Sequence, residues 1–208
     1  MAADTTLSIT QIELGLAQYF NFRNNVIVPN VSWGLLNHEA DLLILNKSGY
    51  LTEIEIKRSW ADFLADFRKR HTHEDTKVSW HYYAVPESIV DKCREKLAEV
   101  DPGHKWGLIS YSASWDGECW PKIESQPSNI HHHCSERKLY LEEQFQLARL
   151  GAMRTWSLKE KIIKNLLLSR SLEKLNFILY APFCGQIFFP ARPFPKAKQK
   201  TKRSEAFP

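Results

Sequence analysis

Hydrophobic residues alternate with polar ones, or run together in short stretches, through much of the first half of the chain. Residues 40–57, ADLLILNKSGYLTEIEIK, place two such stretches around a Gly-containing turn, which predicts a β-hairpin. Residues 26–33, 78–86 and 106–112 are rich in β-branched and aromatic residues and are predicted strands. Pro29 in the first of these is typical of an edge strand or a bend.

Apolar residues at helical spacing predict helices before and between these strands. Near the N-terminus four of them recur every three or four residues: Ile9, Ile12, Leu16 and Phe20. Residues 59–70 form a second predicted helix with Ser59 as its N-cap, and residues 87–100 form an amphipathic third. The order α-β-β-β-α-β-α-β predicts an α/β fold in which helices flank a mixed central sheet.

The pattern weakens beyond residue 115, where WDGECWPKI predicts a turn with a short strand. Residues 135–153 and 157–175 are two further predicted helices. Residues 196–203, KAKQKTKR, carry five basic residues and almost no apolar ones, which is typical of a disordered tail. We therefore expect three parts: a core over residues 1–128, a helical C-terminal extension over 129–190 and a basic tail over 191–208.

Composition places the chain among ordinary globular proteins. Of its 208 residues, 43% are hydrophobic and 25% charged, and the net charge of +4 is too small to indicate nucleic-acid binding by itself. The first ten residues lack the basic and apolar regions of a secretory signal, and the longest apolar stretch, 177–190, is too short to span a bilayer. Four scattered cysteines without a Cys-x-x-Cys pair suit reduced thiols, so we expect a cytoplasmic protein with no membrane segment.

The segment His131–Cys134, HHHC, contains side chains that commonly bind metals. Its spacing matches no standard zinc module, even when Cys119 is added, and three consecutive histidines on a loop cannot all face one ion. Zinc binding is therefore the less favoured interpretation of this segment.

The turn of the predicted hairpin decides which side chains lie together. Residues 46–50, NKSGY, suit a three-residue loop with Gly49 in the left-handed conformation. Asp41 would then lie opposite Glu55, with Cβ atoms ~5 Å apart and Lys57 next along the same face. A two- or four-residue loop would turn Asp41 to the other face of the sheet.

Two adjacent carboxylates repel each other unless a cation lies between them. A hard divalent ion such as Mg²⁺ binds oxygen ligands, commonly one or two carboxylates together with water and substrate phosphate oxygens. Lys57 cannot bind the ion as an ammonium, but it can orient or deprotonate a water molecule or stabilise charge on a phosphate. Asp41, Glu55 and Lys57 therefore predict a site for phosphodiester hydrolysis.

The spacing from Asp41 to the EIEIK of residues 53–57 resembles that of the PD-(D/E)XK nuclease superfamily. The chain is most similar to the MmcB-like group of proposed DNA-repair endonucleases, in which EIK, a serine, DF and a further Asp precede an aromatic strand. Here these pieces are EIKRSWADFLADFRK and HYYAVPESI, followed by WGLISYS. The resemblance covers residues 8–125 and departs from the pattern at Ala40, where the superfamily name has proline.

The resemblance implies a restriction-endonuclease-like α-β-β-β-α-β core and metal-dependent cleavage of DNA, in repair or in mobile-element processing. It implies Asp41 and Glu55 as ligands of Mg²⁺ or Mn²⁺ and the backbone carbonyl of Ile56 as a further ligand. It also implies Lys57 as the catalytic lysine. Glu13 on the first helix matches a glutamate that completes the site in many relatives.

Plainer interpretations exist for each of these residues. Asp41, Glu55 and Lys57 would form a salt bridge on a solvated hairpin face. TQIE, ending at Glu13, is itself a capping box, which needs no metal. Glu53 is expected to flank the metal ligands, with a role as principal acid as the alternative.

Basic residues near the second predicted helix are expected contacts for nucleic acid. Arg68 and Lys69 end that helix, where basic residues also complement the helix dipole, and Lys77 precedes the aromatic strand. The sequence thus predicts a Mg²⁺- or Mn²⁺-dependent nuclease acting on DNA. The alternative is a nucleic-acid-binding module of the same fold that cuts nothing, and a third is a partner-binding protein that assembles through its helical extension.

Overall fold

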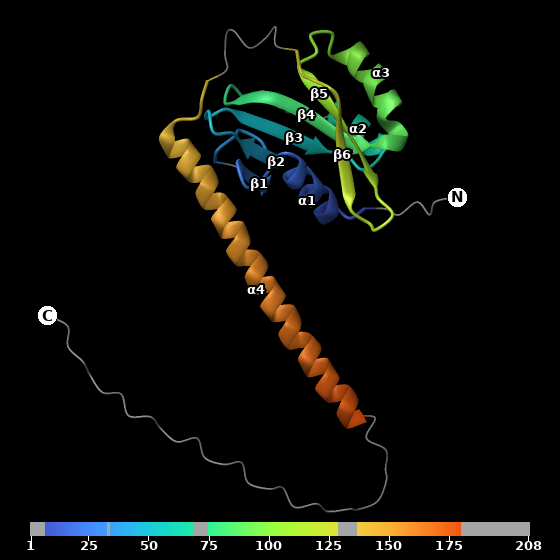
Figure 1. Cartoon of the computed structure of the whole chain (residues 1–208), viewed down its shortest axis with the longest axis vertical. Helices are drawn as coiled ribbons and strands as arrows, with labels where there is room; N and C mark the ends of the chain where they lie inside the picture. Colours follow the sequence, from blue (N-terminus) through green and yellow to red (C-terminus); the bar gives the residue numbers. More distant parts are fainter. Residues whose placement is uncertain (1–6, 33, 69–74, 129–136, 180–208) are drawn as a thin grey trace, which may run out of the picture. The chain divides into compact units, whose positions relative to one another are not determined.

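The computed structural model describes the backbone of residues 7–32, 34–68, 75–128 and 137–179 (Figure 1). Contacts within the chain divide it into two compact units, residues 1–162 and 163–208, and the boundary falls inside the last helix. The elements follow in this order: α1 (Ile9–Tyr19), β1 (Val26–Val31), β2 (Ala40–Leu45), β3 (Leu51–Ile56), α2 (Trp60–Asp66), β4 (Val78–Pro86), the 3₁₀ turn η1 (Glu87–Ile89), α3 (Val90–Val100), β5 (Trp106–Ala113), β6 (Cys119–Ser125) and α4 (Leu141–Leu179).

Six strands form one mixed sheet, in which every strand lies beside its neighbours in sequence. Strands β1, β2 and β3 are antiparallel, β3, β4 and β5 are parallel, and β6 returns antiparallel to β5. The parallel pairings place the C-terminal ends of β3, β4 and β5 at the same end of the sheet. Strand β1 lies at the edge, as Pro29 predicts.

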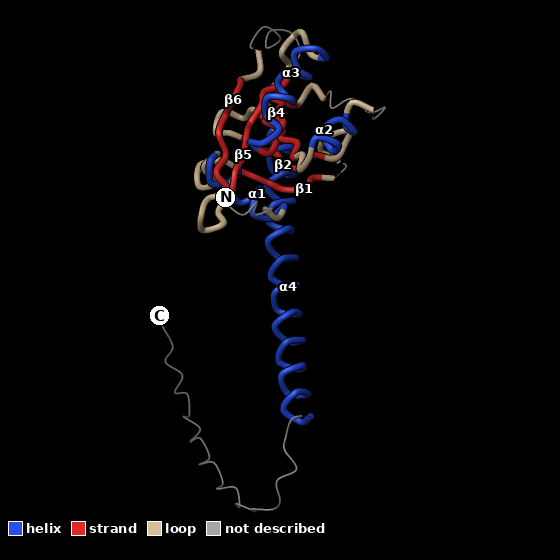
Figure 2. The backbone as a smooth tube through the Cα atoms, turned by 90° about the vertical axis from the view of Figure 1, so that its right-hand side faces the viewer, coloured by secondary structure: helices blue, strands red, loops and turns tan. Residues whose placement is uncertain are grey.

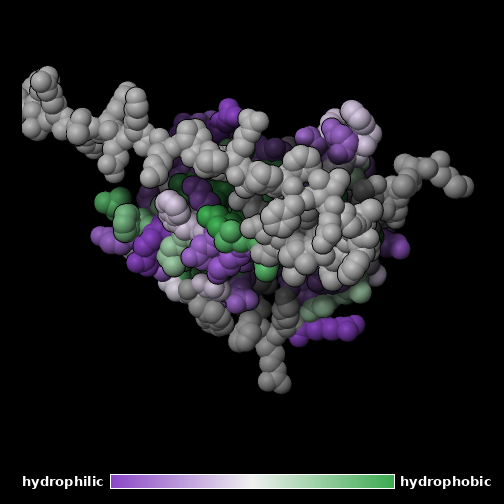
Figure 3. Space-filling model, turned by 90° about the horizontal axis from the view of Figure 1, so that it is seen from below, coloured by the Kyte–Doolittle hydropathy of each residue, from purple (hydrophilic) through white to green (hydrophobic). Residues whose placement is uncertain are grey.

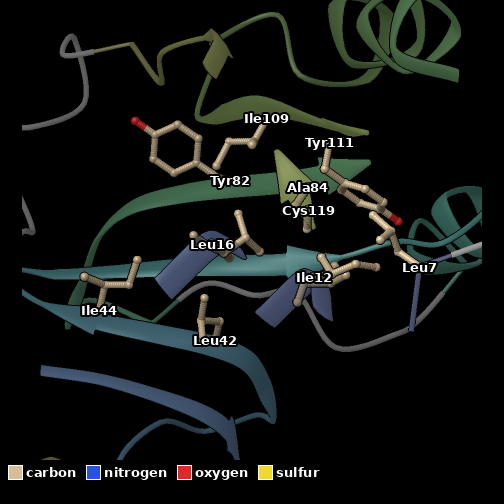
Figure 4. Packing of buried hydrophobic residues seen from close by; sticks show 12 residues of the cluster. Leu7, Ile12, Leu16, Leu42, Ile44, Tyr82, Ala84, Ile109, Tyr111 and Cys119 are labelled. Atoms are coloured by element: carbon tan, nitrogen blue, oxygen red, sulfur yellow. The ribbon is translucent and has the colours of Figure 1, made fainter. Parts of the chain in front are cut away.

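Helix α1 covers one face of the sheet. Its Ile12 and Leu16 are 1% and 0% exposed and point toward the strands (Figure 4). They pack against even-numbered strand residues: Leu42, Ile44, Ile54, Ile56, Tyr82 and Ala84. Gly15 lets the helix approach β6 closely, because a Cβ at this position would lie 2.6 Å from the carbonyl oxygen of Cys119.

The opposite face is covered by α2, α3 and the first turns of α4, and Figure 2 shows the strands between α1 and α2. One apolar cluster joins strand residues to α2 and α3: Phe63, Tyr83, Val85, Val90, Cys93, Leu97 and Leu108. A second cluster includes residues at the start of α4 and on β1 to β4: Val28, Leu43, Leu45, Leu51, Val78 and Leu147. Glu53, Glu55 and Lys57 project from this face, since they alternate with the isoleucines that face α1.

Viewed from below, the coloured surface in Figure 3 carries small areas of apolar side chains next to hydrophilic ones. In the described part of the chain, no helix combines the length and the apolarity that crossing a lipid bilayer requires.

The predicted order of elements and the α/β class, with helices on both faces of a mixed sheet, are confirmed. Ser59 caps α2 as predicted, through the N–H of Asp62. The prediction of two C-terminal helices is wrong, because α4 runs without interruption through residues 154–156, which separate the two predicted helices. The predicted basic tail, residues 191–208, and the HHHC segment lie outside the described residues.

Candidate functional site

The β2–β3 hairpin has the register that its turn predicts. The Asn46 N–H donates a hydrogen bond to the Tyr50 carbonyl at 3.0 Å, and Gly49 has a φ of 88°, which a side chain would disfavour. Leu43 consequently lies opposite Glu53. The three-residue loop is therefore confirmed.

Regular pairing of the two strands ends at Leu42 and Ile54, and Asp41 and Glu55 directly flank this last pair. Both acids therefore lie where the pairing of β2 with β3 ends. The Asp41 carboxylate accepts a hydrogen bond from the backbone N–H of Ile56 at 2.9 Å. Because the N–H and C=O of a strand residue point to the same side, the Ile56 carbonyl also points toward Asp41.

Lys57 follows Glu55 on the same face of the sheet. Its Nζ lies 2.9 Å from Oε2 of Glu55 and 3.0 Å from Oδ1 of Asp66 on α2, and each of the three side chains is at most 4% exposed. The Tyr83 hydroxyl donates to Oδ2 of Asp66 at 2.9 Å, and the Tyr111 hydroxyl donates to the Lys57 carbonyl at 3.0 Å. Lys57 is therefore fixed through both its side chain and its backbone.

The charge state of Lys57 follows from these neighbours. Burial lowers the pKa of Lys57, but the carboxylates of Glu55 and Asp66 outweigh burial and hold that pKa above its ordinary value of 10.5. Lys57 is therefore an ammonium at neutral pH, which suits it to orient water or stabilise negative charge rather than to accept a proton. Burial, together with the charge of Asp66, raises the pKa of Tyr83 well above its usual range, so its hydroxyl remains a donor.

Glu53 is fully buried beside this pair of acids, with an exposed fraction of 0%. Its Oε1 lies 2.8 Å from Nε2 of His38, and its Oε2 lies 3.5 Å from Nδ1 of His81 on β4. The other ring nitrogen of His38 lies 2.7 Å from Oδ1 of Asn37. Glu53 thus flanks the predicted ligand pair and is engaged there by two imidazoles.

Glu13 approaches the same end of the sheet from α1. Its Oε1 accepts a hydrogen bond from the Asn30 side chain at 2.8 Å. Burial raises the pKa of Glu13; the Asn30 hydrogen bond and the Arg154 charge oppose that rise, and the negative charge of Asp41 adds to it. The carboxylates of Glu13 and Asp41 are therefore close enough to interact electrostatically.

The predicted capping box at residues 10–13 is wrong. Ser8 caps α1, its side chain accepts from the Gln11 N–H, and the Gln11 side chain returns a contact to the Ser8 backbone. The helix thus begins one residue before Thr10, and Glu13 takes no part in its capping.

Of the three predicted nucleic-acid contacts, Lys77 lies away from this site. Arg68 is exposed just after α2, and Lys69 lies outside the described residues. Lys77 precedes β4, at the opposite end of the sheet from Lys57. Its Nζ contacts the Leu35 carbonyl and lies 3.9 Å from Oε1 of Glu143 on α4.

Four residues of the site carry no role in the sequence prediction: His38, Asp66, His81 and Tyr83. Asp66 lies in ADFLAD and Tyr83 in YYAVP, two segments that carry the family resemblance. The sequence motifs could therefore have pointed to these two residues. His38 and His81 have no such signal, because a lone histidine in a loop or on a strand indicates nothing without its partner.

The donor set suits a hard divalent cation. Among the residues that the structure describes, no group of three or more His, Cys, Asp or Glu side chains is gathered closely enough to enclose a metal ion. Mg²⁺ requires fewer protein ligands, because it commonly keeps several waters and binds substrate phosphate oxygens. Asp41 and Glu55, with the Ile56 carbonyl on the same side, match that smaller set.

Comparison with known proteins yields little. No family model matches the chain, and no curated protein matches it. One similar solved structure is the SPO1766 protein of unknown function from Silicibacter pomeroyi, with a TM-score of 0.43 and 18% identity over 85% of this chain and 94% of that chain. The function of this chain must therefore be inferred from its own site.

Proposed function

We propose that the chain is a metal-dependent nuclease that hydrolyses phosphodiester bonds in DNA. The observation that supports this most is the convergence of Asp41, Glu55 and Lys57 where β3 ends: Asp41 accepts from the Ile56 N–H, and the neighbouring residues Glu55 and Lys57 contact each other. The element order α1-β1-β2-β3-α2-β4 accords with the restriction-endonuclease-like core that the family resemblance implies. A role in DNA repair or mobile-element processing rests on that resemblance, and a cytoplasmic location rests on the four scattered cysteines.

Burial of the charged groups argues against a plain surface salt bridge. Exposed ion pairs contribute about 0–1 kcal/mol and are common. Glu55, Lys57 and Asp66 are instead at most 4% exposed. Desolvating such groups costs several kcal/mol per ion, and apolar replacements of similar volume are often as stable. A buried charge cluster of this kind is more readily explained by function than by stability.

Each residue has a defined part in this proposal. Asp41 and Glu55 would hold Mg²⁺ or Mn²⁺, with the Ile56 carbonyl and Glu13 as further oxygen ligands. When bound, the ion polarises a phosphate oxygen and lowers the pKa of water. Lys57, as an ammonium, orients the attacking water and stabilises the negative charge that develops on the phosphate.

A nucleic-acid-binding module without catalytic activity is the second candidate. The contact of Lys57 with two carboxylates favours it, because an ion-pair network satisfies the lysine without substrate. Against it, both acids and the lysine of the motif are present in this chain.

Incubation with plasmid, single-stranded and branched DNA, in Mg²⁺ or Mn²⁺, separates the two candidates. The nuclease proposal expects cutting by the wild-type chain and its loss in Asp41→Asn and Lys57→Met. Lys96→Met and Glu99→Gln are matched controls, since that pair also lies at 2.9 Å but on the surface of α3. Binding without cutting would support the second candidate, and the absence of both activities would contradict both.

A further inference from the structure

One face of α4 packs against strand β1. Leu147 is 0% exposed, Leu150 packs on the same apolar cluster, and a Cβ on Gly151 would lie 3.1 Å from Cγ2 of Val28. Residues 147, 150, 151 and 154 lie on one side of a helix. This packing carries Arg154 to the edge of the sheet.

Arg154 reaches the carboxylate end of the site through β1. Its Nη2 donates to the backbone carbonyl of Asn30, whose side-chain amide donates to Oε1 of Glu13. Asn30 has a φ of 52°, a left-handed conformation that asparagine adopts more readily than most residues. The guanidinium also interacts electrostatically with Glu13, which in turn interacts with Asp41.

The guanidinium has capacity for a further ligand. Arginine carries five N–H donors, and its planar fork matches the oxygens of a phosphate. The hydrogen bond to the Asn30 carbonyl uses one nitrogen, and the Arg154 side chain is exposed. Attachment of α4 to β1 is already provided by Leu147, Leu150 and Gly151, so stability does not require an arginine here.

We propose that Arg154 binds a backbone phosphate of the nucleic-acid substrate beside the Asp41–Glu55 pair, so that helix α4 supplies part of the substrate-binding surface. This inference rests on the proposed function and deepens it. Acidic groups gather at this end of the sheet and repel a polyanion, and a fixed cation beside them would oppose that repulsion. It also assigns the first turns of α4 to the site rather than to a separate extension.

The salt dependence of DNA binding tests the inference directly. Binding of a short labelled duplex to the full-length chain would be measured by fluorescence anisotropy over a series of salt concentrations, in the presence of EDTA so that nothing is cut. The logarithm of the binding constant falls linearly with the logarithm of the salt concentration. Each lost phosphate contact makes this slope shallower by about 0.9 for duplex DNA. Arg154→Ala should show that loss, whereas Arg154→Lys should keep the wild-type slope with weaker binding.

Arg149→Ala is the matched control. Arg149 is also exposed and lies on the same helix, five residues earlier and therefore on a different side. Its slope should equal that of the wild type, and thermal unfolding should show that all three variants are folded. An unchanged slope in Arg154→Ala, with a wild-type chain that binds and cuts DNA, overturns this inference alone. A wild-type chain that neither binds nor cuts DNA overturns the proposed function as well.

Discussion

The ammonium of Lys57 lies 2.9 Å from Oε2 of Glu55, and both side chains are only 4% exposed. Side chains two residues apart along a strand share a face, and Lys57 directly follows the last residue of β3, so Glu55 and Lys57 lie on one face of the sheet. Asp66 on α2 contacts the same ammonium at 3.0 Å. A cation between two carboxylates, all of them buried, is thus built from neighbouring parts of the chain.

Removal of the Lys57 ammonium should destabilise the fold. Lys57→Met leaves Glu55 and Asp66 buried without their shared cation, so its free energy of unfolding should fall by about 3–5 kcal/mol in chemical denaturation. Lys96→Met, which breaks the more exposed 2.9 Å pair with Glu99, should change it by less than about 1 kcal/mol. Equal, small losses in both variants would show that the buried pair is not the ion pair described.

The same pair predicts a pH dependence at alkaline pH. Burial lowers the folded-state pKa of Lys57, but the carboxylates of Glu55 and Asp66 outweigh burial and raise that pKa above 10.5. Its contribution to stability is therefore fully present below pH 10.5 and is lost as pH rises through the folded-state pKa. The difference in unfolding free energy between wild type and Lys57→Met should shrink above pH 10.5. A difference that stays constant to higher pH would contradict the assignment.

Tyr83 and Tyr82 are neighbours on β4 whose hydroxyls serve opposite faces of the sheet. The Tyr83 hydroxyl donates to Asp66, whereas that of Tyr82 donates to Gln126. Tyr83→Phe should cost about 1–3 kcal/mol of stability and slow DNA cleavage about tenfold, because Asp66 positions Lys57. Tyr82→Phe should leave the cleavage rate unchanged. Equal rates in the two variants, measured under single-turnover conditions, would remove Tyr83 from the site.

Gly49 tests the turn on which the register depends. At its φ of 88° a side chain is strained, and a Cβ would lie 3.3 Å from Nε2 of Gln144. Gly49→Ala should destabilise the chain by about 1–2 kcal/mol in urea unfolding. Ser48→Ala, next to it in the same turn and exposed, should stay within about 0.5 kcal/mol of the wild type. No cost at Gly49 would mean that the turn has another conformation.

Local sequence signals were sufficient for the β2–β3 hairpin. Asn46 and Gly49 dictate a three-residue loop, and that loop sets Leu43 opposite Glu53 and so brings Asp41 and Glu55 to the same end of the hairpin. Glu55 and Lys57 share one face because they are two residues apart, which follows from β geometry. These contacts depend on residues fewer than twenty positions apart.

The remaining parts of the site depend on distant elements. His38 meets Glu53 through a loop, Asp66 arrives on α2, and Arg154 comes from a helix more than a hundred residues away. Contacts between such distant elements cannot be predicted from the local pattern of a single sequence. The start of α1 was misjudged for a local reason, because Ser8 and Thr10 are both acceptable N-caps.

A titration of Mn²⁺ into the full-length chain measures directly whether Asp41 and Glu55 hold one divalent cation. Asp41→Asn is the decisive variant, because an amide oxygen can still accept from the Ile56 N–H while the charge is lost. Calorimetry should show one ion bound per wild-type chain and no detectable binding to a folded Asp41→Asn. Wild-type affinity in that variant, or no ion bound by the wild type, would contradict it.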